Sequence, residues 1–147
     1  MAASLLFTGC ASVNMAGKEE TTKARQFNAP EHGYAGVYVY RDSFVGQALK
    51  KDLWIDDKCI GETANKVFFY TQVEGDKTHK LATESEFSPN TLEVPLAGDK
   101  NYFFRQYIKM GVFVGGANLE QVPEEEGKKE VAQLDMAKAG SCSGASQ

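Results

Sequence analysis

The chain has 147 residues, which is enough for one domain and too few for two of ordinary size. Its net charge is −4 and no segment carries a run of Lys and Arg, so the sequence lacks the basic surface on which nucleic-acid binding depends. A hydrophobic content of 42% excludes a wholly disordered chain, and no apolar run reaches the roughly 18 residues of a membrane-spanning helix.

The N-terminus begins with a short apolar run that ends at a cysteine. The order Leu-Phe-Thr-Gly before Cys10 resembles the cleavage region of a bacterial lipoprotein signal, although Phe7 stands where leucine is commoner. No basic residue precedes the cysteine, whereas a secretory signal starts with a charged region and a longer apolar core. We interpret residues 1–9 as the remnant of a signal peptide and Cys10 as the lipidated residue, the alternative being an ordinary N-terminus with a chance cysteine.

Lipidation would place the protein on a membrane. Fatty chains such as palmitate on Cys10 would hold it there, since two or more chains anchor stably. Ala11 follows the cysteine, and by resemblance to Gram-negative lipoproteins this implies the outer membrane, with the domain facing the periplasm. Residues 10–33 are polar, with one or two helical turns expected within Lys18–Gln26. We expect a tether there, with Phe27 docking on the domain.

Short apolar-alternating segments predict a β-rich domain over residues 34–138, which includes a C-terminal helix. The first, Tyr34–Arg41, alternates strictly and fits a half-buried strand. Turn residues recur about every 8 to 12 residues, which is typical of a small antiparallel β-sandwich of the Ig-like or PEGA-like kind. Pro95 indicates a strand at a sheet edge. The other expected strands are 51–56, 59–62, 67–70, 77–87, 91–96, 101–110 and 117–122.

The character of the chain changes at Pro123. A proline followed by three glutamates suits the first turn of a helix, because the helix N-terminus is positive. Val131 and Leu134 lie three residues apart and can share one face. The sequence therefore predicts a helix over about residues 123–138 and a flexible tail over residues 139–147.

Two further cysteines, Cys59 and Cys142, remain once Cys10 is lipidated. The periplasm is oxidising, so these two can pair, and the bond would close a loop of roughly 80 residues and contribute about 4 kcal/mol. The alternative is two unpaired thiols, one in a strand and one in the tail. The sequence leaves both open, because it does not place the two Cα atoms within reach.

Aromatic residues and arginines gather on one face of the expected sheet. If the aliphatic face is core, the opposite face carries Tyr38, Tyr40, Trp54, Phe103, Arg105 and Tyr107. Left exposed, such a patch marks a binding surface. The alternative is that the C-terminal helix covers it.

The two Phe-Val-Gly segments, 44–46 and 113–115, have two readings of their own. They could neighbour each other at one end of the domain and touch lipid or a partner. Alternatively, they are bulges or tight turns that bury their aromatic rings.

Several of these segments together resemble a known family. They are VYVYR (37–41), SFVG (43–46), WIDDKCIGE (54–62) and YFFRQYIKMGVFVGGANLEQV (102–122). They resemble a bacterial family of short lipoproteins that is catalogued as a domain of unknown function, over about residues 24–138. The hairpin has Asp57-Lys58 where the family usually has Asp-Gly. The resemblance implies a β-rich envelope domain and supplies no catalytic residues.

The sequence contains no motif for catalysis or metal binding. His32 and His79 lie 47 residues apart, and no CxxC, HExxH, GxSxG or phosphate loop occurs. We therefore expect a non-enzymatic lipoprotein without cofactors or a bound metal, whose β domain binds a protein partner or a cell-wall component. The alternatives are a hydrolase or transferase acting on envelope material, with a pocket around His79 or His32, and a structural spacer.

Overall fold

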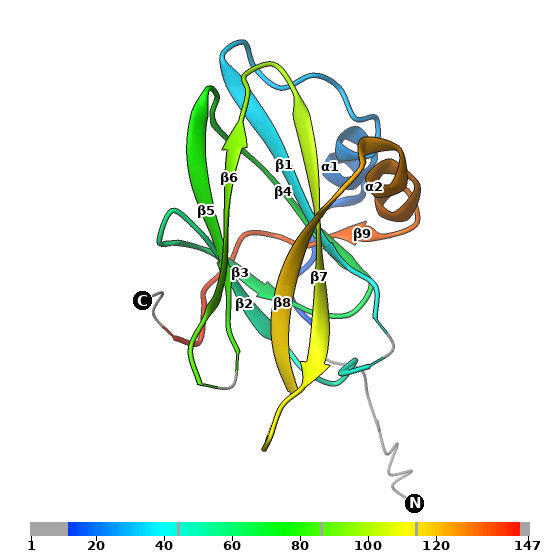
Figure 1. The fold of residues 1–147 in the computed structure, drawn as a ribbon. Helices are drawn as coiled ribbons and strands as arrows, with labels where there is room; N and C mark the ends of the chain where they lie inside the picture. Colours follow the sequence, from blue (N-terminus) through cyan, green and yellow to red (C-terminus); the bar gives the residue numbers. More distant parts are fainter. Residues whose placement is uncertain (1–11, 44, 86, 114, 145–147) are drawn as a thin grey trace, which may run out of the picture.

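The computed structural model describes residues 12–43, 45–85, 87–113 and 115–144, and it contains two β-sheets packed face to face (Figure 1). One sheet has five strands, in the order β8 (Gly115–Val122), β7 (Asn101–Met110), β1 (Tyr34–Arg41), β4 (Val67–Glu74) and β9 (Asp135–Met136). The other has four, in the order β3 (Lys58–Thr63), β2 (Lys51–Ile55), β5 (Lys77–Thr83) and β6 (Asn90–Leu96). The predicted β-sandwich is confirmed.

The strands pair mainly in antiparallel fashion. Two pairs are parallel: β1 lies beside β7, with Val39 opposite Phe104, and β4 lies beside β9. Pro95 belongs to β6 at the edge of the four-stranded sheet, as predicted, where a missing amide proton interrupts no ladder. The parallel pairing of β1 and β7 places the two longest aromatic segments side by side in the middle of the first sheet.

The main core lies between the two sheets. Val37 and Val39 of β1 point inward, as their alternation predicts, and share this core with Phe104 of β7. The opposite sheet contributes Leu53 and Leu81, both fully buried. A polar bridge crosses the same interior, since the Gln106 amide contacts Thr63 and donates to the Thr83 hydroxyl at 2.7 Å.

Two helices cover the outer face of the five-stranded sheet, α1 (Lys18–Ala24) and α2 (Glu124–Val131) (Figure 1). Beneath them lies a second core of aromatic and aliphatic side chains: Ala24, Tyr38, Tyr40, Phe68, Phe103, Val122, Val131 and Leu134. Helix α2 approaches the sheet closely at Gly127, where an added Cβ would lie 2.2 Å from Cγ of Phe103. Both faces of this sheet are therefore buried where the helices cover it.

The tether predicted for residues 10–33 is wrong from Val13 onward. Val13 packs against the main core, and the Asn14 carbonyl accepts a hydrogen bond of 2.9 Å from the Lys138 amide. Met15 forms a bridge with Ala137, and α1 follows directly. Phe27 docks on the second core, as predicted. The domain thus begins near residue 13, because backbone pairing with the C-terminal segment holds the polar N-terminal residues in place.

The C-terminal segment also departs from its prediction. The helix ends at Val131 rather than near residue 138, because the chain turns there to bury Leu134 and then adds β9 to the sheet. The flexible tail is wrong for residues 140–144. Gly140 donates to the Ile60 carbonyl at 3.0 Å, and Cys142 forms a disulfide with Cys59, with Cα atoms 6.0 Å apart. Of the two states of the cysteines, the paired one is confirmed.

Candidate functional site

The predicted aromatic binding surface is mostly buried. Tyr38, Tyr40 and Phe103 are 1–2% exposed because α1 and α2 cover them, so the binding-surface prediction is wrong for these residues and the covering alternative is correct. Trp54 is 3% exposed and belongs to β2 of the other sheet. Period-2 alternation assigns a residue to a face but not to a sheet, which is why Trp54 was grouped with the others.

Arg105 and Tyr107 remain partly exposed, further along β7 than α2 reaches. The Arg105 guanidinium donates to a Glu120 carboxylate oxygen at 2.8 Å and lies 5.2 Å from the centroid of the Tyr107 ring. Lys109 follows Tyr107 by two residues on the same strand, and its Nζ lies 5.8 Å from the centroid of the same ring. The Tyr107 ring thus lies between two basic side chains, in the part of β7 that the helices do not cover.

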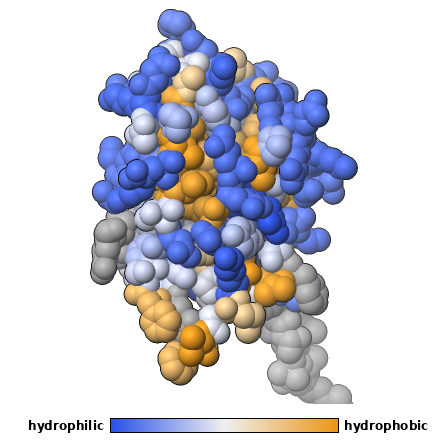
Figure 2. Space-filling model, viewed as in Figure 1, coloured by the Kyte–Doolittle hydropathy of each residue, from blue (hydrophilic) through white to orange (hydrophobic). Residues whose placement is uncertain are grey.

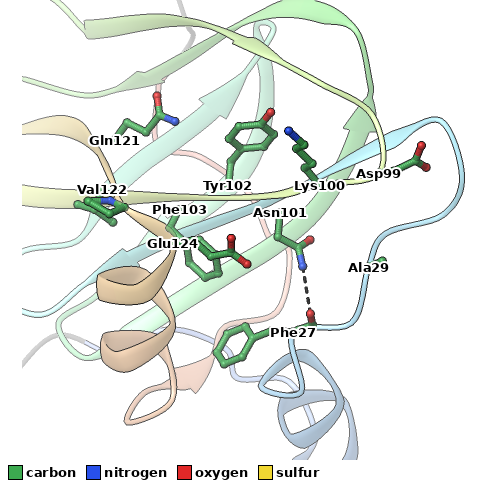
Figure 3. Close-up of a pocket in the computed structure, with 11 residues that line it drawn as sticks. Phe27, Ala29, Asp99, Lys100, Asn101, Tyr102, Phe103, Gln121, Val122 and Glu124 are labelled. Carbon is green, nitrogen blue, oxygen red and sulfur yellow. Dashed lines mark hydrogen bonds between the residues drawn. The ribbon is translucent and has the colours of Figure 1, made fainter.

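A cleft of about 510 Å³ opens where β7 begins (Figure 3). Three segments that are distant in sequence form it: residues 27–29, the turn into β7, and the passage from β8 into α2. The lining residues are Phe27, Ala29, Asp99, Lys100, Asn101, Tyr102, Phe103, Gln121, Val122, Pro123 and Glu124. The cleft was not predicted from the sequence, because no single segment carries more than part of it.

Asn101 fixes one wall of the cleft. Its side-chain amide nitrogen donates to the Asn28 carbonyl at 3.0 Å and to the Phe27 carbonyl at 3.3 Å. Figure 3 shows the second of these hydrogen bonds. Its Oδ1 is buried against Gly36, where an added Cβ would lie 2.0 Å from that oxygen. Asn101 therefore holds the segment after α1 against the start of β7, and a larger residue at position 36 would force the Asn101 side chain to move.

The charges of the cleft are mixed. Asp99 accepts hydrogen bonds from the Gly33 amide at 2.9 Å and at 3.1 Å from His32, and the Gly33 bond is the main reason that the pKa of Asp99 lies below its ordinary value. Glu124 pairs with Lys128 at 2.8 Å. Lys100 is exposed and has no ion pair with any residue that the structure describes. The lining of the cleft thus combines an ammonium group, two carboxylates and the ring of Phe27.

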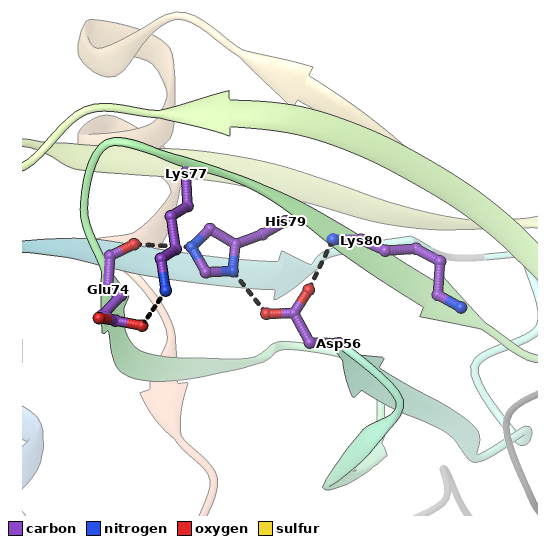
Figure 4. A network of polar contacts seen from close by, with 5 residues as sticks. All are labelled: Asp56, Glu74, Lys77, His79 and Lys80. Carbon is purple, nitrogen blue, oxygen red and sulfur yellow. Dashed lines mark hydrogen bonds and ion pairs between the residues drawn. The ribbon is translucent and has the colours of Figure 1, made fainter.

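His79, a candidate from the sequence, takes part in a structural network (Figure 4). Its Nδ1 contacts the Asp56 carboxylate and its Nε2 lies 2.7 Å from the Glu74 carbonyl oxygen. Partial burial acts to raise the pKa of Asp56, but hydrogen bonds from the Lys80 amide and from His79 bring it below its ordinary value. His32 belongs to the separate contact with Asp99, so the two histidines do not share a network.

Sequence reasoning missed two charged residues that are completely buried. Arg41 is fully buried, donates to the Leu49 carbonyl at 2.7 Å and also bonds the Gly46 carbonyl, and burial lowers the pKa of its guanidinium to about 10. Asp52 is fully buried and accepts from the Ser143 amide, the Ser143 hydroxyl and the Gly144 amide at 2.9–3.0 Å. The signal for Arg41 was its place at the end of the inward-facing series 35, 37, 39.

Two negative findings concern the described residues alone. Among them, no group of three His, Cys, Asp or Glu side chains is arranged to hold a metal ion. Nor does that part of the chain include a helix with the length and apolarity to span a membrane. Cys10 and the signal remnant, residues 1–9, lie outside the described residues.

Comparison with known proteins gives two matches. Residues 31–117, from just before β1 to the start of β8, match the family model described as "Protein of unknown function (DUF2846)". A Haemophilus influenzae protein described as "Uncharacterized protein" is 59% identical over 133 residues, which cover 90% of this chain and 79% of that protein. The family match contains residues 99–103 of the cleft lining and also Arg41 and Asp52.

Proposed function

Because the chain belongs to the DUF2846 family of proteins of unknown function, we propose its role from the site itself: a non-enzymatic lipoprotein of the bacterial envelope whose cleft binds a cell-wall component. The anchor is the acylated Cys10 and the location is the outer membrane, facing the periplasm. The single observation that carries this proposal is the mixed polar lining of the cleft at the start of β7.

The chemistry of the cleft favours a peptide-like ligand. The Lys100 ammonium group can bind a carboxylate, while Asp99 and Glu124 can bind an amino group. The Phe27 ring and the Gln121 amide add an apolar surface and a hydrogen-bonding group. Stem peptides of the cell wall carry free amino and carboxyl groups together, and this combination suits the cleft better than a purely anionic or purely apolar ligand.

A binding role, rather than catalysis, is supported by the hydrogen bonds of the buried polar groups, which are made to other parts of the domain. His79 has both ring nitrogens against acceptors, Asp52 is saturated by the C-terminal segment, and Arg41 holds the backbone of residues 46 and 49. Each of these groups has a structural partner, so none is poised as a nucleophile or general base. The cleft itself contains no histidine, serine or cysteine in its lining.

Two experiments test the proposal. Labelling of cells with an alkyne fatty acid should mark the wild type and not the Cys10→Ala variant. Binding to purified peptidoglycan sacculi should weaken about tenfold in Lys100→Ala and in Glu124→Gln, since each removes one charge-assisted contact. Lys129→Ala is the matched control, because this exposed lysine of α2 lies outside the lining of the cleft. Equal binding by all variants would contradict the assignment of the cleft.

A further inference from the structure

One end of the molecule carries a set of exposed apolar side chains. We name this set the apolar tip: Val45 (48% exposed), Phe87 (78%), Met110 (81%), Val112 (73%) and Phe113 (83%). Figure 2 shows hydrophobic residues projecting at the lower end of the molecule, in addition to a hydrophobic band along the middle of the same face that is flanked by hydrophilic residues. Large apolar side chains this exposed cost solubility, and when they cluster they mark a surface that is covered in use.

The tip is one surface, although its residues come from three connections. The β5–β6 and β7–β8 connections are joined through Ala117, whose amide donates to the Glu84 carbonyl at 3.1 Å and whose carbonyl accepts from Asn90 at 2.7 Å. The loop between β1 and β2 touches the same hairpin, since an added Cβ at Gly46 would lie 2.7 Å from Ile108. All three connections therefore meet at one end of the sandwich.

We infer that the apolar tip inserts into the interfacial layer of a lipid bilayer. Val45 and Phe87 come from two separate connections, and the other three residues come from the end of β7 and the turn that follows it. Exposed apolar groups from three neighbouring loops can enter a fluid lipid layer together. The position of the N-terminal segment agrees with this orientation. Ser12 and Val13 line the same hollow as Lys50, which ends the loop that carries Val45.

The inference rests on the proposed lipid anchor for its orientation. Two residues of extended chain reach about 7 Å, so an acylated Cys10 would hold the bilayer within that distance of Ser12. A tether this short leaves the domain no room to stand away from the membrane. The end of the molecule that faces the lipid is then the end at which Ser12 and the β1–β2 loop meet.

The charges around the tip favour insertion that is driven mainly by apolar burial. The exposed charged residues there include Lys50 and Lys109, which attract anionic headgroups, and Asp42, which opposes them. The balance is only weakly basic, so binding to lipid should depend little on salt. This separates the tip from a polybasic surface, whose membrane binding salt abolishes.

The same orientation places the proposed binding cleft far from the membrane. Asn101 at the start of β7 lines the cleft, and Met110 at its end belongs to the apolar tip. A strand of ten residues spans about 30 Å. Insertion of the tip would therefore point the cleft away from the lipid and toward the cell wall.

The test uses the full chain with Cys10→Ser, which has no acyl group, and vesicles of phosphatidylethanolamine and phosphatidylglycerol. The chain should float with the vesicles, and raising salt to about 0.5 M should change this little. Phe87→Ser, Met110→Ser and Phe113→Ser combined should weaken the binding at least about tenfold. Met15→Ser with Tyr34→Ser is the matched control and should float as the parent does, since these exposed residues lie outside the tip.

A second readout does not depend on the stability of the triple variant. Phe113→Trp keeps an aromatic residue at the tip, and its fluorescence should be quenched by brominated lipids, whereas the native Trp54 is buried and should not be quenched. Absence of flotation, equal flotation of the triple variant, or Phe113-dependent dimers without flotation would overturn the inference. Flotation without fatty-acid labelling of Cys10 would refute the anchor alone, and labelling without flotation would refute the tip alone.

Discussion

The hydroxyl of Tyr38 donates a 2.8 Å hydrogen bond to the Ala24 carbonyl, whereas the hydroxyl of Tyr40, on the same face of β1, has no partner among the described residues. Both side chains are almost completely buried beneath the helices. The first hydroxyl therefore ties the sheet to α1, while the second is a buried polar group that goes unsatisfied. The two tyrosines form a matched pair for measuring what each hydroxyl contributes.

Removal of the two hydroxyls should affect stability differently. Tyr38→Phe should lower the free energy of unfolding by about 1 kcal/mol, because it breaks a buried hydrogen bond. Tyr40→Phe should leave it unchanged or raise it, because the penalty of burying an unpaired hydroxyl disappears. Urea unfolding of the wild type and both variants measures the difference. A larger loss in Tyr40→Phe than in Tyr38→Phe would mean that Tyr40 has a partner.

Alkaline pH should destabilise the domain through the same residues. Burial, with smaller effects of Glu126 and Glu130, raises the pKa of Tyr40 to about 12, and burial also raises the pKa of Tyr38. The folded state keeps these protons while the unfolded chain releases them near its ordinary pKa of 10.0. Their contribution is therefore complete below pH 10 and falls as the pH rises toward 12. Tyr40→Phe should show a shallower decline in unfolding free energy over this window.

Gly127 sets the distance between α2 and the sheet. Gly127→Ala should cost about 1 to 3 kcal/mol, although alanine is the better helix former, because the new Cβ would collide with Phe103 and push the helix outward. Gly17→Ala is the control, since a Cβ at Gly17, the residue before α1, would meet nothing within 4 Å. Thermal unfolding of both variants tests the argument, and a stabilised Gly127→Ala would show that the contact yields easily.

The disulfide and the Asp52 carboxylate should act together. Cys142→Ser should lower the free energy of unfolding by about 4 kcal/mol through loss of the cross-link. Asp52→Asn should cost about 1 to 3 kcal/mol in the oxidised protein, because the carboxylate accepts three hydrogen bonds from Ser143 and Gly144. In the Cys142→Ser background the cost should shrink, since the segment is no longer held. Additive losses in a double-mutant cycle would contradict this coupling.

Much of the sheet architecture could be predicted from the sequence, because strict alternation and turn residues are local signals. The bounds Tyr34–Arg41 and Asn101–Met110 match those of β1 and β7. The segments at the two ends of the chain could not be predicted. Met15 pairs with Ala137 through backbone atoms alone, and a backbone bridge leaves no pattern in the side chains.

The sites depended on contacts between distant segments, which the sequence did not resolve. The sequence left open whether Phe103 is exposed or covered, and in the structure α1 and α2 cover it. The disulfide could not be assigned from the sequence, because it depends on residues 140–142 lying beside β3. The exposure of Phe113 was one of two readings of its segment, and the structure places this ring at the surface, 83% exposed.

The parallel pairing of β1 with β7 has a consequence for how quickly the chain can fold. Gly36 lies opposite Asn101, 65 residues later, so the central ladder of the larger sheet joins segments that are far apart along the chain. Non-local pairing of this kind gives a high contact order, and domains of this class fold in milliseconds to seconds. Until that ladder closes, the aromatic strand β1 has no neighbour on one side, which makes this interval the period in which a newly synthesised chain is most prone to aggregate.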